Sequence, residues 1–248
     1  MLLMNNPDSK HSSTLPGRSL LSRAIFKPAI FRFMKDLQAN NNRDWFQANK
    51  DRYENELRGP ALEFITEFGE HLLAISPHFR ADPRRSGGSL FRIYRDIRFS
   101  KDKSPYKDHV GIHFRHQEGK NAHTPGFYLH LQPRNCFVGV GLWRPDSSIL
   151  KVLRANVAAN PDAWRQVVQD DAFRQAYTIE AESLKRVPRG YAADHEMAEV
   201  LKLKSYTAFT PLTQRQVTST DFVEEYARLC QVGGRLVRYL CEALGHPY

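Results

Sequence analysis

Apolar residues recur every three or four positions in the N-terminal part of the chain, which is the spacing of one helix face. The first such face consists of Phe26, Ile30, Phe33, Met34 and Leu37. A second helix is expected to begin at an Asn41 or Asn42 cap and to stop at Gly59-Pro60, where Pro60 suits the first turn of a third helix. The stretch SPHFRADPRRSGGS that follows is expected to be a loop.

The middle of the chain changes to an alternating or β-rich pattern, which is typical of strands. Four such runs are Leu90–Phe99, Val110–Arg115, Phe127–Gln132 and Cys136–Leu142. Turn residues separate them, so the sequence predicts a meander and a largely antiparallel sheet. Residues 177–184 also alternate and are expected to form another strand.

Helical patterns return after the predicted sheet. Asp146 is expected to cap a helix that runs through Val157, and Asn160-Pro161 can start another. The last helix has the clearest signals. Asp221 and Glu224 have capping-box spacing, an apolar face follows, and Gly245 lies past the end.

Helices, then a sheet, then helices predict an α+β fold, with a largely antiparallel sheet flanked by N-terminal and C-terminal helices. We expect a single α+β domain over residues 23–248. Residues 1–22 are polar and have no period, so they are expected to be a disordered tail.

The composition is that of a soluble protein with a basic surface. The chain has 248 residues and a net charge of +9. It contains no stretch of about 18 apolar residues, so no membrane-spanning helix is expected. Cys136, Cys230 and Cys241 are widely spaced, which argues against a disulfide framework and favours a reducing, cytoplasmic location. About six of the excess positive charges fall between Arg80 and Lys120, which favours anionic partners.

That positive charge is concentrated in the segment FRIYRDIRFSKDKSPYK, residues 91–107. On a strand, Arg92, Tyr94, Asp96 and Arg98 would share one face, while Arg95 would lie among the apolar residues of the other. Guanidinium groups match phosphate and carboxylate oxygens in geometry. The residues expected to bind a phosphate-bearing small anion are Arg92, Arg95, Arg98, Lys101, Lys103, Tyr106 and Lys107.

Asp96 is expected to be an orienting group, together with Tyr94, and not a base. Arginines beside Asp96 stabilise the charged carboxylate and should lower its pKa. Arg95, if buried, must find a carboxylate partner or turn to the polar face through a bulge. An internal Arg/Asp ion-pair network and a nucleic-acid surface are the alternatives to an anion site.

Histidines are also frequent between residues 109 and 130, but we expect them to be structural. They are His109, His113, His116, His123 and His130. No cysteine partner or HxxxH helix accompanies them, so no metal site is predicted. His113 follows the basic segment and is the best functional candidate, with His130 expected across from it; Arg189 is a further possible site residue. Cofactors and catalytic residues stay unknown, because no phosphate-binding loop, dinucleotide fingerprint or G-x-S-x-G motif is present.

The basic segment also carries a resemblance. RIYRDIRFSKDKSPY resembles the signature R-x-x-R-D-x-R-F, followed by a Lys-rich loop ending in Tyr, of a domain-of-unknown-function family of bacterial and fungal proteins. Similar segments follow in order, among them PGFYLHLQP and GVGLWRPDSSILKVLR, from about Ile25 onward. The resemblance implies no reaction. The residues themselves favour a phosphate-binding protein, with hydrolysis or transfer of a phosphate ester as an open extension.

Overall fold

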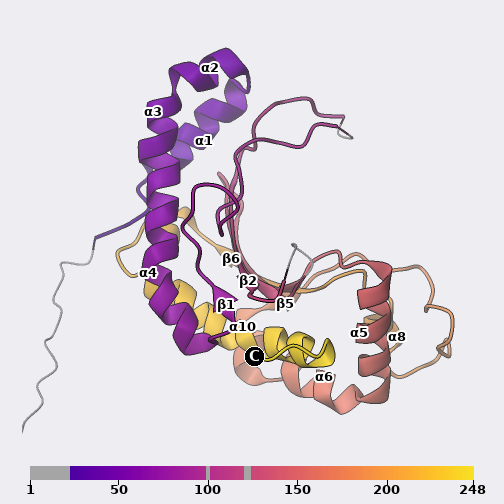
Figure 1. The fold of residues 1–248 in the computed structure, drawn as a ribbon. Coiled ribbons are helices and arrows are strands. Elements are labelled where there is room, and N and C mark those ends of the chain that lie inside the picture. Colours follow the sequence, from indigo (N-terminus) through magenta and orange to yellow (C-terminus); the bar gives the residue numbers. More distant parts are fainter. Residues whose placement is uncertain (1–22, 99–100, 120–123) are drawn as a thin grey trace, which may run out of the picture.

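A six-stranded antiparallel sheet organises the chain in a computed structural model that describes residues 23–98, 101–119 and 124–248 (Figure 1). The strand order is β1-β2-β3-β4-β6-β5. The strands are β1 (Phe79–Arg80), β2 (Val110–His116), β3 (Gly126–Leu131), β4 (Cys136–Leu142), β5 (Thr178–Ile179) and β6 (Tyr206–Leu212). Together with the helices before and after it, this sheet confirms the predicted α+β fold.

The N-terminal helices follow the predicted apolar faces. They are α1 (Ala29–Ala39), α2 (Arg43–Ala48), α3 (Lys50–Arg52), the π-helical turn η1 (Tyr53–Arg58) and α4 (Gly59–Ile75). Asn42 is the predicted cap, since its side chain accepts a hydrogen bond from the Trp45 amide at 2.9 Å. The apolar face of α1 is fully buried, as its spacing predicts.

The predicted break at Gly59-Pro60 is wrong, because the helix continues through it. The Gly59 amide donates to the Glu54 carbonyl, which closes the wide i→i+5 turn of η1. A Cβ at Gly59 would lie 2.9 Å from that carbonyl oxygen, so glycine permits the turn. Pro60 then falls in the first turn of α4, where its missing N–H costs little. Figure 1 shows α3 and α4 as one column.

Three of the four predicted strands are confirmed, but Leu90–Phe99 is not a strand over its described residues, 90–98. This segment has only isolated bridges, Leu90 to Ile112 and Tyr94 to Tyr106. The Phe91 amide still donates to Gly111 of β2, but farther along the Arg95 amide donates to Pro105 and the Ile93 carbonyl accepts from Lys107. Pro105 cannot donate a hydrogen bond to extend this short ladder. Residues 90–98 and 101–107, here called the basic arm, project from the sheet (Figure 1).

The remaining strands differ more from the sequence expectations. β6 was not predicted, yet it pairs with β4 along its whole length, from Cys136 opposite Leu212 to Leu142 opposite Tyr206. The strand expected at 177–184 is reduced to the two residues of β5. β1 lies inside the stretch expected to be loop and pairs with the end of β2.

The C-terminal helices are α5 (Ser147–Ala159), α6 (Pro161–Val168), α7 (Asp171–Ala176), α8 (Ala198–Leu201), α9 (Gln214–Val217) and α10 (Phe222–Ala243). The three predicted C-terminal helices, α5, α6 and α10, begin where expected, and three short helices were not predicted. The Asp146 carboxylate accepts from the Ser148 and Ile149 amides, as expected. Asp221 makes no side-chain cap bond to α10; the capping box that forms is Thr213 with Gln216, at α9.

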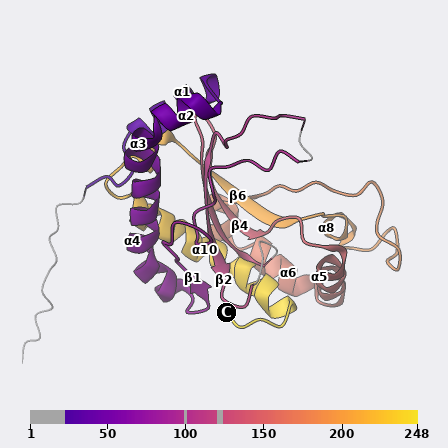
Figure 2. The ribbon, with the colours of Figure 1, turned by 45° about the horizontal axis from the view of Figure 1, so that its top comes forward.

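One face of the sheet is buried against helices. α10 packs on β4 and on α4, and it runs between α4 and α6 (Figure 2). Residues that alternate along β2, β3 and β4, such as Phe114, Leu129 and Val138, are fully buried on this side. Within the described part of the chain, no helix is long and apolar enough to cross a membrane. The predicted tail, residues 1–22, lies outside the described residues.

Alanine substitutions at Gly141 and Gly69 test whether the backbone requires glycine at one position and tolerates a side chain at the other. Gly141 has a φ of 110°, and an added Cβ would lie 2.1 Å from the Tyr206 carbonyl oxygen. We expect Gly141→Ala to lower the free energy of unfolding by at least about 2 kcal/mol. Gly69 lies inside α4, and an added Cβ there would lie 3.6 Å from the Ala81 Cβ, an ordinary contact distance. Gly69→Ala should therefore raise the free energy of unfolding by up to about 1 kcal/mol. Urea unfolding measures both, and equal effects would contradict the expectation.

Candidate functional site

The face of the sheet that points away from α10 carries a row of polar and aromatic side chains. His113 of β2 lies opposite Tyr128 of β3, which lies opposite Gly139 of β4, which lies opposite Phe209 of β6. Because side chains alternate along each strand, all four positions share one face. The next row joins Gly111, His130, Phe137 and Pro211 in the same way.

This face forms the floor of a cavity of about 430 Å³. Its walls are mainly aromatic and imidazole rings, contributed by Phe91, His109, His113, Tyr128, His130, Phe137, Trp143 and Phe209. Glycines keep the floor open, since a Cβ at Gly126 would lie 2.7 Å from His113 Nε2, and one at Gly139 would lie 3.2 Å from the Phe209 ring. A mostly apolar cavity with a few polar groups is the usual form of a small-molecule site.

His113 is a polar group of this cavity without a hydrogen-bond partner among the described residues. Its side chain is 9% exposed, and neither ring nitrogen has a hydrogen bond from the described residues. The ring meets Phe91 and Tyr128 edge-on, with centroids 6.1 and 6.3 Å apart. Burial, with a smaller contribution from Arg115, lowers the pKa of His113 to about 4. A neutral imidazole is therefore available to a ligand as one donor and one acceptor.

His130 is held from both sides and at both nitrogens. Its ring stacks on His109 and on Phe137, each at 4.6 Å. The Tyr128 hydroxyl donates to Nδ1 at 3.0 Å, and Nε2 donates to the side-chain oxygen Oε1 of Gln132 at 3.4 Å. Burial, and next the neighbouring His109, lowers the pKa of His130 to about 4, so the stacked imidazoles are neutral together.

Asp108 joins this network to the basic arm. Its carboxylate accepts from Gln132 at 3.1 Å, from Gln38 at 3.2 Å and from His109 Nδ1 at 3.4 Å, and Arg95 lies 3.8 Å away. Burial would raise the pKa of this carboxyl, but the hydrogen bonds from Gln38 and His109 outweigh it, and the pKa is lowered. Asp108 is thus the shared anion between the cavity and the arm.

The arm is fixed to the N-terminal helices at Tyr106. The amide of Asn41 bonds both the Tyr106 carbonyl and the Tyr106 N–H, at 3.0 and 3.1 Å. The Tyr106 ring is 5% exposed and stacks on Phe46 at 4.0 Å. In this position the ring anchors the arm, and it does not line the cavity.

Carboxylates of the arm accompany two of its arginines. Arg98 forks onto Asp96, with distances of 3.0 and 2.7 Å, and Arg95 pairs with Asp102 as well as Asp108. The hydrogen bond from the Arg98 side chain, and next the one from its backbone amide, lowers the pKa of Asp96 to about 2. The side chain of Asp96 therefore holds Arg98 as expected, and Arg95 has the partner that its partial burial requires.

The lysines of the arm differ among themselves. Lys103 donates to the Ile97 carbonyl at 2.9 Å, and Lys101 is exposed. Lys107 donates to the Arg92 carbonyl at 2.7 Å and lies over the Phe91 ring, 5.6 Å from its centroid. Burial, then the charges of Arg92 and Arg95, lowers the pKa of Lys107. No described carboxylate pairs with Lys107, so positive charge remains beside the Phe91 wall of the cavity.

The structure thus brings together part of the expected site. His113 and His130 line the cavity, and Lys107 lies behind its Phe91 wall. His130 lies opposite Gly111 and not opposite His113, so the expected register was displaced by two residues; Tyr128 occupies that place. The exposed Tyr94 packs near Tyr106, and Arg189, also exposed, does not line the cavity. The anion-binding role of the arm stays a prediction.

Sequence reasoning missed Tyr128, Asp108 and the contribution of β6. The alternation in GIHFRH, GFYLHL and CFVGVGL could have placed Tyr128, the histidines and the glycines on one face. Nothing in the sequence indicates that Phe209, about seventy positions after β4, lies beside β4 and lines the cavity. The position of Asp108 could not be predicted, because it depends on the path of the returning part of the arm and on contacts with residues remote in the chain.

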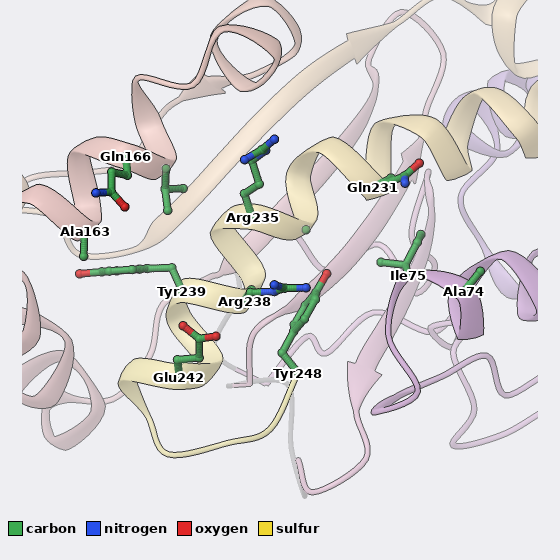
Figure 3. Close-up of a pocket in the computed structure, with 12 residues that line it drawn as sticks. Ala74, Ile75, Ala163, Gln166, Gln231, Arg235, Arg238, Tyr239, Glu242 and Tyr248 are labelled. Carbon is green, nitrogen blue, oxygen red and sulfur yellow. The ribbon is translucent and has the colours of Figure 1, made fainter.

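A larger cavity, of about 590 Å³, lies between α10, α6 and the end of α4, but its polar groups diverge. In Figure 3, Arg238 extends toward Tyr248 while Tyr239 extends toward Ala163. Arg235 is paired with Asp170 at 3.4 Å. The cavity on the sheet is therefore the better candidate.

Asp108 and the exposed Asp96 are expected to differ in how much each carboxylate contributes to stability. Asp108→Asn removes the charge on which four groups converge, and we expect a loss of about 1–2 kcal/mol in the free energy of unfolding. Asp96→Asn, at an exposed pair, should leave it unchanged. Denaturant unfolding at neutral pH compares the two. A larger effect of Asp96→Asn would assign the arm's stability to the Arg98 pair instead.

The neutral His113 makes stability depend on pH in a defined window. Its pKa of about 4 in the folded chain is below the ordinary value of 6.5, so the unfolded chain binds more protons between these values. Stability is therefore complete above about pH 6.5 and falls as the pH drops toward 4, by roughly 3 kcal/mol at most for this group. His113→Gln should flatten that slope, and His71→Gln, outside the cavity, should not. Identical slopes in wild type and His113→Gln would contradict this.

The comparisons with known proteins bear on the family alone. No curated protein and no solved structure matches the chain. Residues 29–239 match a family described as conserved hypothetical protein, DUF2461. The match includes the basic arm, all six strands and most of α10. The chain therefore belongs to the DUF2461 family of conserved hypothetical proteins.

Proposed function

We propose that this protein binds a small molecule with a flat, mainly apolar body and a negatively charged group, a phosphate-bearing, nucleotide-like ligand being the class that fits best. The observation that carries the proposal is the buried, neutral imidazole of His113, which has no hydrogen-bond partner among the described residues and lines the cavity. A ligand in the cavity can therefore form hydrogen bonds with this ring that the described part of the chain does not supply.

The walls supply the surface for the flat body. Phe91, Phe137 and Phe209 border the cavity, and Trp143 lies at its margin with 61% of its surface exposed. Aromatic side chains stack on planar ligands in offset or edge-on arrangements. The glycines of β3 and β4 leave room for a ring to lie against the sheet.

The positive charge beside Phe91 supplies the partner for the anion. Lys107 lies over the Phe91 ring, and the charges of Arg92 and Arg95 act on the same ammonium group. Burial, and next the charges of Arg92 and Arg95, lowers the pKa of the Lys107 ammonium, so part of that shift is repulsion between cations. A phosphate group placed there would relieve this repulsion and gain charge-assisted hydrogen bonds.

Hydrolysis or transfer is not part of the proposal. The imidazoles of His113 and His130, with pKa values of about 4, are weak bases at neutral pH, and Asp96 is held by Arg98. What the arrangement supports is recognition.

Binding of AMP, ADP, adenosine and inorganic phosphate to the full chain tests the proposal by calorimetry. We expect a nucleotide to bind more tightly than adenosine, and both Lys107→Met and His113→Leu to weaken it at least about tenfold, which is 1.4 kcal/mol. Lys101→Met removes an exposed cation of the same arm and should change the affinity less than about twofold. Lack of binding by every probe, or equal effects of Lys107→Met and Lys101→Met, would exclude this site.

An oligonucleotide belongs in the same panel, because Tyr94 is 55% exposed beside the exposed Arg92. An exposed aromatic ring with neighbouring cations can stack on a base. Binding of single strands that is tighter than that of AMP, and that falls steeply with salt, would favour a nucleic-acid surface over the cavity.

A further inference from the structure

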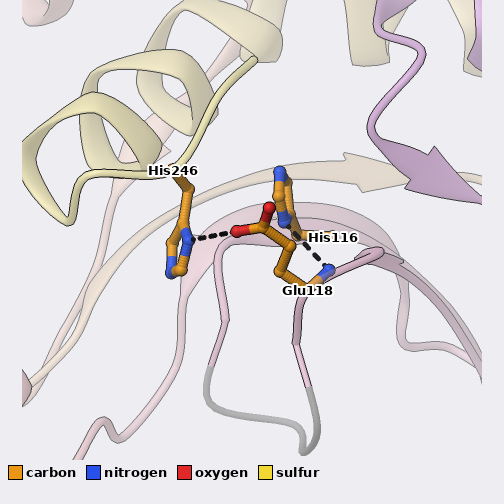
Figure 4. Close-up of side chains that lie close together, drawn as sticks. All are labelled: His116, Glu118 and His246. Carbon is orange, nitrogen blue, oxygen red and sulfur yellow. Dashed lines mark hydrogen bonds and ion pairs between the residues drawn. The ribbon is translucent and has the colours of Figure 1, made fainter.

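Three possible metal ligands, two from the middle of the chain and one from its C-terminal segment, meet beside the end of the sheet (Figure 4). His116 is the last residue of β2, Glu118 lies in the turn that follows, and His246 lies after α10, 128 positions beyond Glu118. One donor atom from each lies within 4.8 Å of the other two. The cluster could not be predicted from the sequence, because His246 is remote from the other two residues in the chain.

His116 is held in the form that a metal ligand needs. Its side chain is 1% exposed, and Nε2 lies 2.9 Å from the Pro247 carbonyl oxygen. A carbonyl can only accept, so Nε2 carries the hydrogen and Nδ1 carries the lone pair. A backbone carbonyl that fixes the far nitrogen is the usual outer support of a metal-bound histidine. The present partner of Nδ1 is the Glu118 amide, at a long 3.3 Å.

Glu118 and His246 already approach the spacing of a coordinated pair. His246 Nδ1 lies 3.1 Å from Glu118 Oε2. Bonds of about 2.0–2.1 Å in a tetrahedron place neighbouring ligand atoms about 3.4 Å apart. The side chains of Glu118 and His246 are 53% and 27% exposed, so water can reach the fourth position and the ligands can adjust.

We propose that His116, Glu118 and His246 form a binding site for one divalent transition-metal ion of the zinc type. Two imidazoles and one carboxylate suit Zn²⁺, Co²⁺ or Ni²⁺, whereas Mg²⁺ and Ca²⁺ prefer oxygen ligands. The ion would join the segment after α10 to the end of β2. That segment already packs there, because the Tyr248 ring meets Phe79 edge-on at 5.8 Å.

The competing interpretation is a plain ion pair between His246 and Glu118, with His116 as a buried structural residue. Both interpretations give the same contacts without metal. They differ in what a metal does, since an ion that binds the folded chain alone must raise its melting temperature.

Titration of the full chain, first stripped with a chelator, with ZnCl₂ distinguishes them. We expect one Zn²⁺ per chain, a higher melting temperature with Zn²⁺, and no shift with Mg²⁺. Glu118→Gln and His246→Gln should each weaken Zn²⁺ binding at least about tenfold, since even the loss of an outer partner costs 10–100-fold. His195→Gln, a histidine outside the cluster, should bind as wild type does.

Co²⁺ provides a direct readout of the ligands. A tetrahedral site gives Co²⁺ intense visible absorption, which both cluster variants should lose and His195→Gln should keep. Zn²⁺ affinity that is unchanged in Glu118→Gln and His246→Gln, or absent in the wild type, overturns the proposal. The cluster shares no residue with the cavity on the sheet, so either proposal can fail without the other.

Discussion

The packing of one face of the four long strands against helices is the constraint from which the candidate site follows. α10 and α4 take up the apolar residues of β2, β3 and β4, which fixes the pairing register because a shift by one residue would expose that whole set. The alternate residues then must lie on the other face. His113, Tyr128, His130 and Phe209 are therefore neighbours there because of what is buried beneath them.

Some cations of the basic arm are paired with carboxylates of the protein, and others are not. Arg95 and Arg98 meet carboxylates of the same segment or its continuation, which favours the internal network for that part of the motif. Lys107 and Arg92 meet no described carboxylate, and Lys107 lies over the Phe91 ring. The arm thus supplies its own counter-ions at its outer part and leaves positive charge where it joins the cavity. Asp108 links the two parts through hydrogen bonds to His109 and Gln132.

The sequence predicted well what depends on neighbouring residues. Apolar periodicity located α1, α4 and α10, alternation located β2, β3 and β4, and the side chains of Asn42 and Asp146 cap the helices that they precede. It failed where a distant contact outweighed a local preference. The π turn at Gly59 continues a helix past a proline, and β6 pairs with β4 despite Pro211. After a single bridge from Leu90 to β2, residues 93–95 pair with the returning segment and not with the sheet.

The sequence by itself determined the α+β fold, the family, and the faces on which the strand residues of the site lie, because side-chain direction in a strand follows from position alone. Only the tertiary structure decided which of those residues meet. The pairing of His113 with Tyr128 depends on the register of β2 and β3. The surroundings of the His113 ring depend on the side chains that form the cavity walls. The approach of His246 to Glu118 depends on the packing of α10. Each of these is a contact between segments far apart in the chain, and such contacts form only when the whole core is buried.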